Sequence, residues 1–378
     1  MFRDPRQRGL AIGGWLVCFM GGSAIGPVVG GVLLERYWWG SVFLLGVPAM
    51  IVLLVCGPLL LPAPRPSGTA RLDPASVALS LASILPIVYG LKELARAGWH
   101  PVPLLVIAFG VIVGVGFVRR QRALTHPLLD LRLFTNRVFA TALGAMFLGT
   151  LLMGAMMLYI TERLQLVEEL SPLQTGLWML PAAGASAVSV LIAPLLAQRI
   201  RPAVLIPAGL ALSVLALAIL ATLDARTGPA PVALCFALTN FGAGPLITLA
   251  TELIVGSVPP ERAGSAGAVT ETSGEFGFAL GIAALGSLGV AVYRGTISLP
   301  GGLPAEAAAA SRDTLAGAAE AAQKLPPGLK ADLLAAVHQA FTAGMQTAAA
   351  TSAVLLAGLA VLIAVALRNE PLAGADSE

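Results

Sequence analysis

Two acidic residues, Glu271 and Glu275, lie four positions apart in an otherwise apolar run from Ala263 to Val292. Residues at this spacing share one face of a helix, with side chains about 6 Å apart. A charge at mid-bilayer costs on the order of 3 kcal/mol on insertion scales, so acids at that depth usually face a polar cavity and serve a function. Two carboxylates this close in a low dielectric cannot both ionise cheaply, so we expect the pair to hold a proton that a cation could displace.

The chain that positions these acids has the composition of an integral membrane protein. Of its 378 residues, 57% are hydrophobic and only 11% are charged, which is outside the range of soluble globular domains. It contains 42 Gly and 27 Pro, typical of helical membrane bundles in which small residues let helices approach closely. The alternation of a β-barrel is absent, so the sequence predicts an all-α membrane protein.

Residue types that serve catalysis or metal binding are dispersed along the chain. No CxxC spacing and no Ser/His/Asp arrangement occurs, and the net charge of +3 gives no support for nucleic-acid binding. We therefore expect neither an enzyme nor a bound metal or cofactor. The cysteines and histidines are Cys18, Cys56, Cys235, His100, His126 and His338.

Hydropathy and turn residues predict about ten membrane-spanning helices. The expected spans are 10–33, 41–61, 75–91, 102–118, 138–160, 173–196, 203–223, 231–254, 263–292 and 343–367. Fourteen basic residues fall in one set of loops and ends. The opposite short loops, expected on the outer side, hold five, namely Arg36, Lys92, Arg96, Arg163 and Arg226. This bias predicts that both termini are cytoplasmic.

Two helix starts are marked by a capping residue followed by proline, at Ser171-Pro172 and Asp73-Pro74.

The segment 293–342 is the one sizeable extramembrane piece that these spans leave. Its Ala-rich first part after Pro304 predicts a surface helix that breaks at Leu325-Pro326-Pro327-Gly328. Its second part, from Leu329 to Phe341, is expected to run into the last span. The loop could be a solvated spacer, a lid or a docking site for a partner.

The first predicted span carries a glycine and proline pattern at Gly22, Gly26, Pro27, Gly30 and Gly31. Glycines four apart share one helix face and let a neighbouring backbone pack closely, while a proline removes one hydrogen bond and bends the helix. A pair of glycines at this spacing is common in membrane helices. The ten-residue string GSAIGPVVGG is far more specific.

This string resembles the antiporter motif, GxxxGPxxGG, of the drug:proton antiporters of the major facilitator superfamily. The resemblance extends along essentially the whole chain, through the run Ser171-Pro-Leu-Gln-Thr-Gly176 and the run Pro259-Pro-Glu-Arg-Ala-Gly264, and it is to the fourteen-helix branch. It implies a major facilitator-like bundle, with 1–61 a remnant of the N-terminal bundle and 62–137 two extra central helices and a cytoplasmic loop. Residues 138–378 would form the C-terminal six-helix bundle, with the outer loop 293–342.

The resemblance also implies the function of the acids. The family's thirteenth helix commonly carries acids in the pattern Glu-Thr-x-x-Glu, which here is Glu271 to Glu275, and these would be the site of proton or cation coupling. The alternative is that one acid only pairs with a polar group between helices. The cargo would be lipophilic or cationic drugs, antiseptics or toxic metabolites, exported across the bacterial inner membrane.

Five other side chains are candidates for a cavity. Asn240 lies beside the helix-breaking run Gly242-Ala-Gly244-Pro245, where polar groups at mid-depth need partners. Trp178, Tyr159 and Met156 could contact a flat apolar cation. Glu252 lies close to the cytoplasmic end of its span, where it is either an interfacial acid or a cavity acid.

The motif belongs to the fifth helix of the family but lies in the first predicted helix of this chain. The resemblance therefore implies that the family's first four helices are missing, and with them much of one of the two bundles that alternating access requires. Export would then depend on those helices, in the same protein or in a separately encoded N-terminal half. Two alternatives stay open: export of an endogenous antibiotic or metabolite, and a non-transporting membrane fragment that assembles with another subunit.

Overall fold

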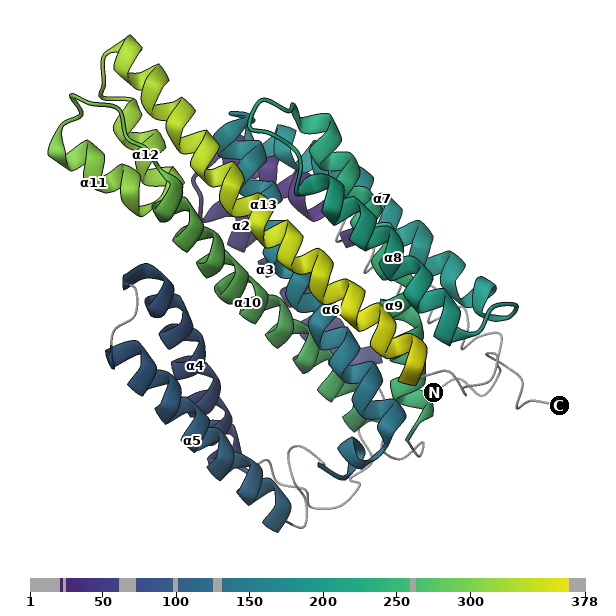
Figure 1. Ribbon diagram of the computed structural model, residues 1–378. Coiled ribbons are helices and arrows are strands. Elements are labelled where there is room, and N and C mark those ends of the chain that lie inside the picture. Colours follow the sequence, from purple (N-terminus) through teal and green to yellow (C-terminus); the bar gives the residue numbers. More distant parts are fainter. Residues whose placement is uncertain are drawn as a thin grey trace.

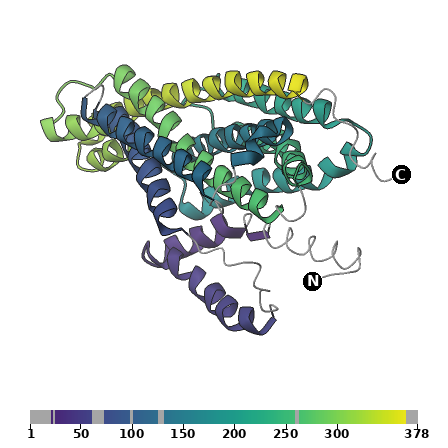
Figure 2. The same cartoon turned by 90° about the horizontal axis from the view of Figure 1, so that it is seen from below.

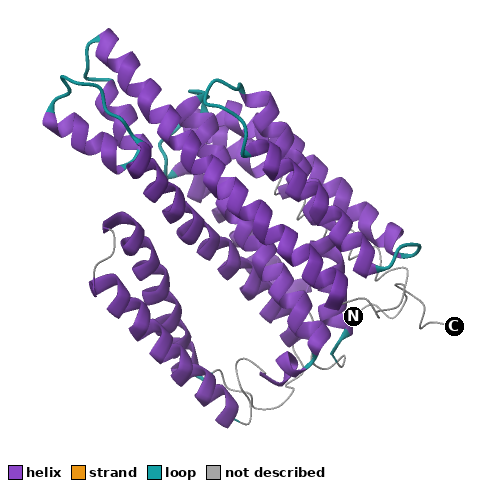
Figure 3. Cartoon of the chain, in the orientation of Figure 1, coloured by secondary structure: helices purple, strands orange, loops and turns teal. Residues whose placement is uncertain are grey.

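The structure is a computed structural model that describes residues 21–22, 25–60, 73–97, 101–124, 131–258 and 263–366. Over these residues it consists of helices, turns and loops, without a strand (Figure 3). The predicted all-α class is therefore confirmed. Among the described helices, seven are long and apolar enough to cross a membrane, and two shorter apolar helices cover Ser41–Gly57 and Pro74–Gly90.

The helices agree closely with the predicted spans. Residues 21–22 and 25–36 are helical, and the rest of the first predicted span lies outside the described residues. The elements after it are α2 (Ser41–Leu44), α3 (Gly46–Leu60), α4 (Pro74–Ala97), α5 (Pro101–Ala123), η1 (Leu131–Thr135), α6 (Arg137–Glu162), η2 (Arg163–Val167), α7 (Pro172–Ala197), α8 (Pro202–Leu220), α9 (Pro229–Gly256), α10 (Ala263–Thr296), α11 (Ala305–Asp313), α12 (Leu315–Ala322) and α13 (Pro327–Ala366).

Helices α6 to α10 and α13 form one bundle in which α6 contacts α9, α10 and α13, and α9 contacts α7 and α8 (Figure 1). Its core includes Phe139, Ile160, Leu210, Leu246 and Met345, none of which is more than 2% exposed. In lipid, such helices associate through van der Waals packing and interhelical hydrogen bonds rather than through a hydrophobic driving force.

Glycines set the distance between α6 and α10. A Cβ added at Gly281 would lie 2.6 Å from the carbonyl carbon of Leu151, and one added at Gly277 would lie 2.7 Å from the carbonyl oxygen of Phe147. Any side chain at these two positions would collide with the backbone of α6. The glycine face of α10 is therefore fixed against α6, which determines where the other faces of α10 point.

Helices α4 and α5 form a hairpin, seen at the lower left of Figure 1, whose α4 contacts α10. The Ser83 hydroxyl donates a hydrogen bond to the Gly110 carbonyl at 3.0 Å between the two helices. Near the start of α4, Arg120 donates to both carboxylate oxygens of Asp73, at 2.9 and 3.1 Å. The hydrogen bond from Arg120 lowers the pKa of Asp73 to about 2, with help from a hydrogen bond from Ser76.

Helix α3 projects away from the bundle (Figure 2). Its side chains at Met50, Ile51, Leu53 and Leu54 are all exposed. A helix that is apolar on every face belongs in lipid or against other helices.

The outer region is more ordered than the sequence predicted. The single surface helix expected after Pro304 is instead two helices, α11 and α12, because Thr314 is extended and its side chain accepts a hydrogen bond from the N–H of Gly317. The hydroxyl of Tyr293, at the end of α10, donates to the Ser311 carbonyl of α11 at 2.6 Å. Helix α12 buries Leu315 and packs against α13.

The last helix begins at Pro327, well before the predicted Ala343, and runs unbroken to Ala366. The expectation that the second half of the outer loop continues into the last span is confirmed. Its first turns bury Leu333, Val337 and Ala340, which lie at helical spacing on one face. A hydropathy window missed this stretch because its opposite face is polar.

Candidate functional site

The acids of α10 lie on the face turned away from the glycines. Glu271 and Glu275 are both exposed, whereas Gly277 and Gly281 are buried against α6. Ala268 and Thr272 extend the exposed face of α10 along the helix. The fold therefore brings the two acids together on one open face, and among the described residues neither of them has a hydrogen-bond or ion-pair partner.

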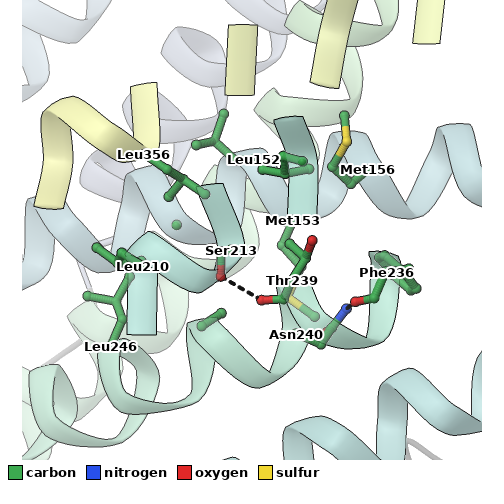
Figure 4. Close-up of a pocket in the computed structure, with 13 residues that line it drawn as sticks. Leu152, Met153, Met156, Leu210, Ser213, Phe236, Thr239, Asn240, Leu246 and Leu356 are labelled. Atoms are coloured by element: carbon green, nitrogen blue, oxygen red, sulfur yellow. Dashed lines mark hydrogen bonds between the residues drawn. The ribbon is translucent and has the colours of Figure 1, made fainter. Parts of the chain in front are cut away.

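A small cavity lies inside the bundle between α6, α8, α9 and α13 (Figure 4). It has a volume of about 30 Å³, and Asn240 and Met156 are among its lining residues. The other lining residues include Met153, Ser213 and Thr239. A space of this size holds about one water molecule and is far below the roughly 300 Å³ of a small-molecule site. Asn240 and Met156 thus meet at a packing cavity rather than at a cargo-sized pocket.

The helix break expected at residues 242–245 does not form, because α9 runs continuously from Pro229 to Gly256 with Pro245 inside it. Polar side chains pair with its backbone instead. Asn240 is 6% exposed, and its amide donates to the Phe236 carbonyl one turn earlier at 2.9 Å. Pro245 has no N–H to offer to the carbonyl of Phe241, four residues before it. The hydroxyl of Ser189, on α7, donates to that carbonyl at 2.5 Å. Ser189 was not among the predicted site residues, although a serine in an apolar span is a typical partner for a carbonyl that a proline leaves unpaired.

The remaining cavity candidates lie elsewhere. Tyr159 is 4% exposed, and its hydroxyl donates to the Leu285 carbonyl of α10 at 2.8 Å, so it joins α6 to α10. Trp178 is half-buried and packs against the core from α7. Glu252 is exposed, one turn before α9 ends at Gly256. None of these three lines the cavity that Asn240 and Met156 share.

The antiporter-motif helix, by which we mean residues 25–36, packs against the start of α7. A Cβ added at Gly31 would lie 2.6 Å from the Cα of Leu173, and one added at Gly176 would lie 2.7 Å from the carbonyl oxygen of Pro27. Only glycine allows this approach from both sides.

Of the predicted motif glycines, Gly31 makes the close contact. Gly22, Gly26 and Gly30 have no heavy atom within 4 Å of an added Cβ among the described residues. Gly31 follows Gly30 by one residue and so points about 100° away around the helix. Close packing on the face of Gly22, Gly26 and Gly30 stays a prediction.

One charged residue is placed quite differently from its expected position in an outer loop. Arg163, at the start of the π-helical segment η2, is fully buried. Its guanidinium donates to the carbonyls of Asp224 and Thr227 at 2.8 and 2.7 Å, and to the Glu168 carboxylate at 3.4 Å. Burial raises the pKa of Glu168, although Arg163 acts in the opposite direction. Arg163 ties the outer end of α6 to the loop between α8 and α9.

Two kinds of comparison with known proteins, a family profile and individual relatives, point to the same family. The family profile described as Major Facilitator Superfamily matches residues 1–282. The multidrug efflux pump LfrA of Mycolicibacterium smegmatis is 36% identical over 369 residues, which are 98% of this chain and 73% of that protein. The methyl viologen resistance protein SmvA of Salmonella typhimurium is 34% identical over 366 residues, 95% of this chain and 73% of SmvA.

A third relative is named for both resistance and export. The tetracenomycin C resistance and export protein of Streptomyces glaucescens is 29% identical over 373 residues, which are 96% of this chain and 68% of that protein. The family profile and these relatives agree with the structure, which is an all-α bundle with the antiporter-motif helix packed on α7. The chain belongs to the Major Facilitator Superfamily.

Proposed function

We propose that this protein takes part in the proton-coupled export of lipophilic or cationic small molecules across the bacterial inner membrane. The observation that carries the proposal is the pair Glu271 and Glu275, exposed together on one face of an apolar transmembrane helix. Relatives named as a multidrug efflux pump and as resistance proteins support the same class of cargo. The arrangement serves transport rather than catalysis.

The coupling follows from electrostatics. When the pair holds a proton, its charge is reduced and a cation has little to bind. When the proton leaves, two carboxylates one helical turn apart attract a cation, and the arrival of the next proton expels it. Cation and proton therefore compete for the same two side chains, and each is released by the other.

The acid face of α10 needs a second wall to form a passage. We propose that helices of the N-terminal bundle supply it, either in the same protein or as a separately encoded half, because alternating access requires two bundles around a central site. Both termini of this chain would then be cytoplasmic, in agreement with the bias of basic residues toward that side. The outer side is accordingly the side of η2, α11 and α12.

The proposal is tested by uptake of a fluorescent lipophilic cation, such as ethidium, into everted membrane vesicles energised by an imposed proton gradient. The double variant Glu271→Gln and Glu275→Gln should abolish the proton-driven part of the uptake. Glu306→Gln, which removes an exposed acid from α11, is the matched control and should leave uptake unchanged. Full uptake by the double variant would refute the assignment.

A second candidate is a subunit that assembles with a partner and does not transport alone. The exposed apolar side chains of α3, among them Met50, Leu53 and Leu54, and the open acid face of α10 favour it. Co-expression with an N-terminal bundle from a relative distinguishes the two. Export in the presence of that bundle supports the exporter, whereas assembly with the bundle without any export supports the non-transporting subunit.

A further inference from the structure

The end of the antiporter-motif helix that carries Glu35 contacts Ser171, the residue that caps α7. Glu35 lies one turn after Gly31, and its carboxylate accepts a hydrogen bond from the hydroxyl of Ser171. Ser171 is the N-cap of α7: its hydroxyl accepts from the N–H of Gln174 at 3.2 Å, and its own N–H donates to the Gln174 side chain at 3.0 Å. One hydroxyl thus joins a carboxylate on the motif helix to the cap of another helix.

The charge of Glu35 suits this position. The first turn of a helix exposes N–H groups without helical partners and carries a partial positive charge. A carboxylate held at this end is stabilised by the helix dipole and strengthens the cap that it contacts. The dipole of α7 therefore attracts the Glu35 carboxylate in addition to the hydrogen bond from Ser171.

The surroundings make the contact specific. The motif helix and α7 meet at backbone distance through Gly31 and Gly176, so Glu35 closes an interface that is already tightly fitted. Directly after Glu35, the rings of Trp38 and Trp39 are exposed and stack edge to face at 5.7 Å. Exposed tryptophans at the end of a membrane helix favour the lipid headgroup region, which would hold this end of the helix at the interface.

We propose that Glu35 is a positioning residue that latches the motif helix to α7 at the outer end of the protein, and that this latch opens whenever cargo leaves. The inference rests on the proposed function for its orientation and its cycle. In the structure the latch is closed. An outward opening between the motif helix and α7 must break the bond from Ser171 to Glu35, so removal of the carboxylate shifts the population toward the open form.

The test measures opening directly by thiol labelling and needs no transport. Thr175 directly precedes Gly176, the α7 residue that meets the motif helix, and is 2% exposed. In membranes containing the full chain, Thr175→Cys should react slowly with a membrane-impermeant maleimide added from outside. Adding Glu35→Ala should accelerate the reaction about two- to five-fold, the range expected for an exposed charge-assisted contact. The native cysteines are first replaced by serine, namely Cys18, Cys56 and Cys235.

Three controls make each outcome decisive. Glu35→Gln keeps an acceptor but loses the charge, and should give an intermediate rate. Glu306→Ala, which removes an exposed acid from α11, should leave the labelling of Thr175→Cys unchanged. Thr222→Cys, on the exposed loop after α8, should label at the same rate with and without Glu35, which shows that access of the reagent is unchanged.

Unchanged labelling of Thr175→Cys in the Glu35→Ala variant overturns the latch, and so does an equal increase at Thr222→Cys. Failure of the proposed function is a separate result, because the Glu271 and Glu275 variants are read by cation uptake and the latch is read by maleimide. Loss of uptake coupling with an intact labelling difference would leave the latch standing on its own.

Discussion

The contact between α6 and α10 allows a quantitative prediction at Gly281. A Cβ at this position would lie 2.6 Å from the carbonyl carbon of Leu151 and 2.9 Å from its Cα, and closer still to the carbonyl oxygen. All three atoms belong to the backbone, which cannot rotate away as a side chain can. Gly281→Ala therefore has to push the two helices apart, and overpacking of this kind costs about 1–3 kcal/mol.

The helix propensity of alanine partly offsets this cost. Alanine is favoured over glycine in a helix by about 1 kcal/mol, so a clash near the upper end of the range leaves Gly281→Ala destabilised by about 2 kcal/mol. Among the described residues, no heavy atom lies within 4 Å of a Cβ added at Gly267, on the same helix. Gly267→Ala should therefore keep only the propensity gain, and the two variants should differ by about 3 kcal/mol.

The assay is thermal unfolding of both purified variants in the same detergent, followed by intrinsic fluorescence. Gly281→Ala should unfold at a lower temperature than the unmodified protein, and Gly267→Ala at an equal or higher one. If both alanine variants unfold together at or above the temperature of the parent, the glycine contact between α6 and α10 is not what the structure describes.

Three further predictions follow from other contacts. Gly176→Val should separate the motif helix from α7 and lower the unfolding temperature, because its added carbons meet the backbone of Pro27. Ser189→Ala should destabilise by about 1–3 kcal/mol in chemical unfolding, because it leaves a buried carbonyl unpaired. Asp73→Asn should lower the unfolding temperature at neutral pH. Since the pKa of Asp73 is lowered to about 2, this difference should persist at pH 5 and shrink as the pH falls from 4 toward 2.

Much of the fold could be predicted because it depends on local signals. Ser171 is the N-cap of α7 and Pro172 its first residue, as the sequence indicated. In the structure Ser171 and Gln174 also form a capping box. The acid pair at four-residue spacing shares one face of α10 because a helix allows no other arrangement. Length and hydropathy located most of the helices within a few residues, the main exception being the start of α13.

Other features depend on contacts between distant segments. Arg163 was expected in a loop, but the carbonyls of Asp224 and Thr227, about sixty residues away, draw it into the interior. The helix expected after Pro304 is divided at Thr314, whose extended backbone lets its side chain cap α12. The high alanine content of this segment predicted a helix but not its division. Tyr159 was a candidate cargo contact, but its hydroxyl donates a hydrogen bond to the Leu285 carbonyl of α10. A sequence pattern gives the face of a helix but not the neighbour that meets it.

The most direct measurement of the central claim is proton movement driven by cargo alone. In proteoliposomes that contain the complete transporter and a pH-sensitive dye, an imposed gradient of a lipophilic cation should drive protons in the opposite direction without any other energy source. With Glu271→Gln and Glu275→Gln together, the dye signal should vanish. Proton movement of undiminished size in that double variant would contradict the assignment of coupling to these two acids.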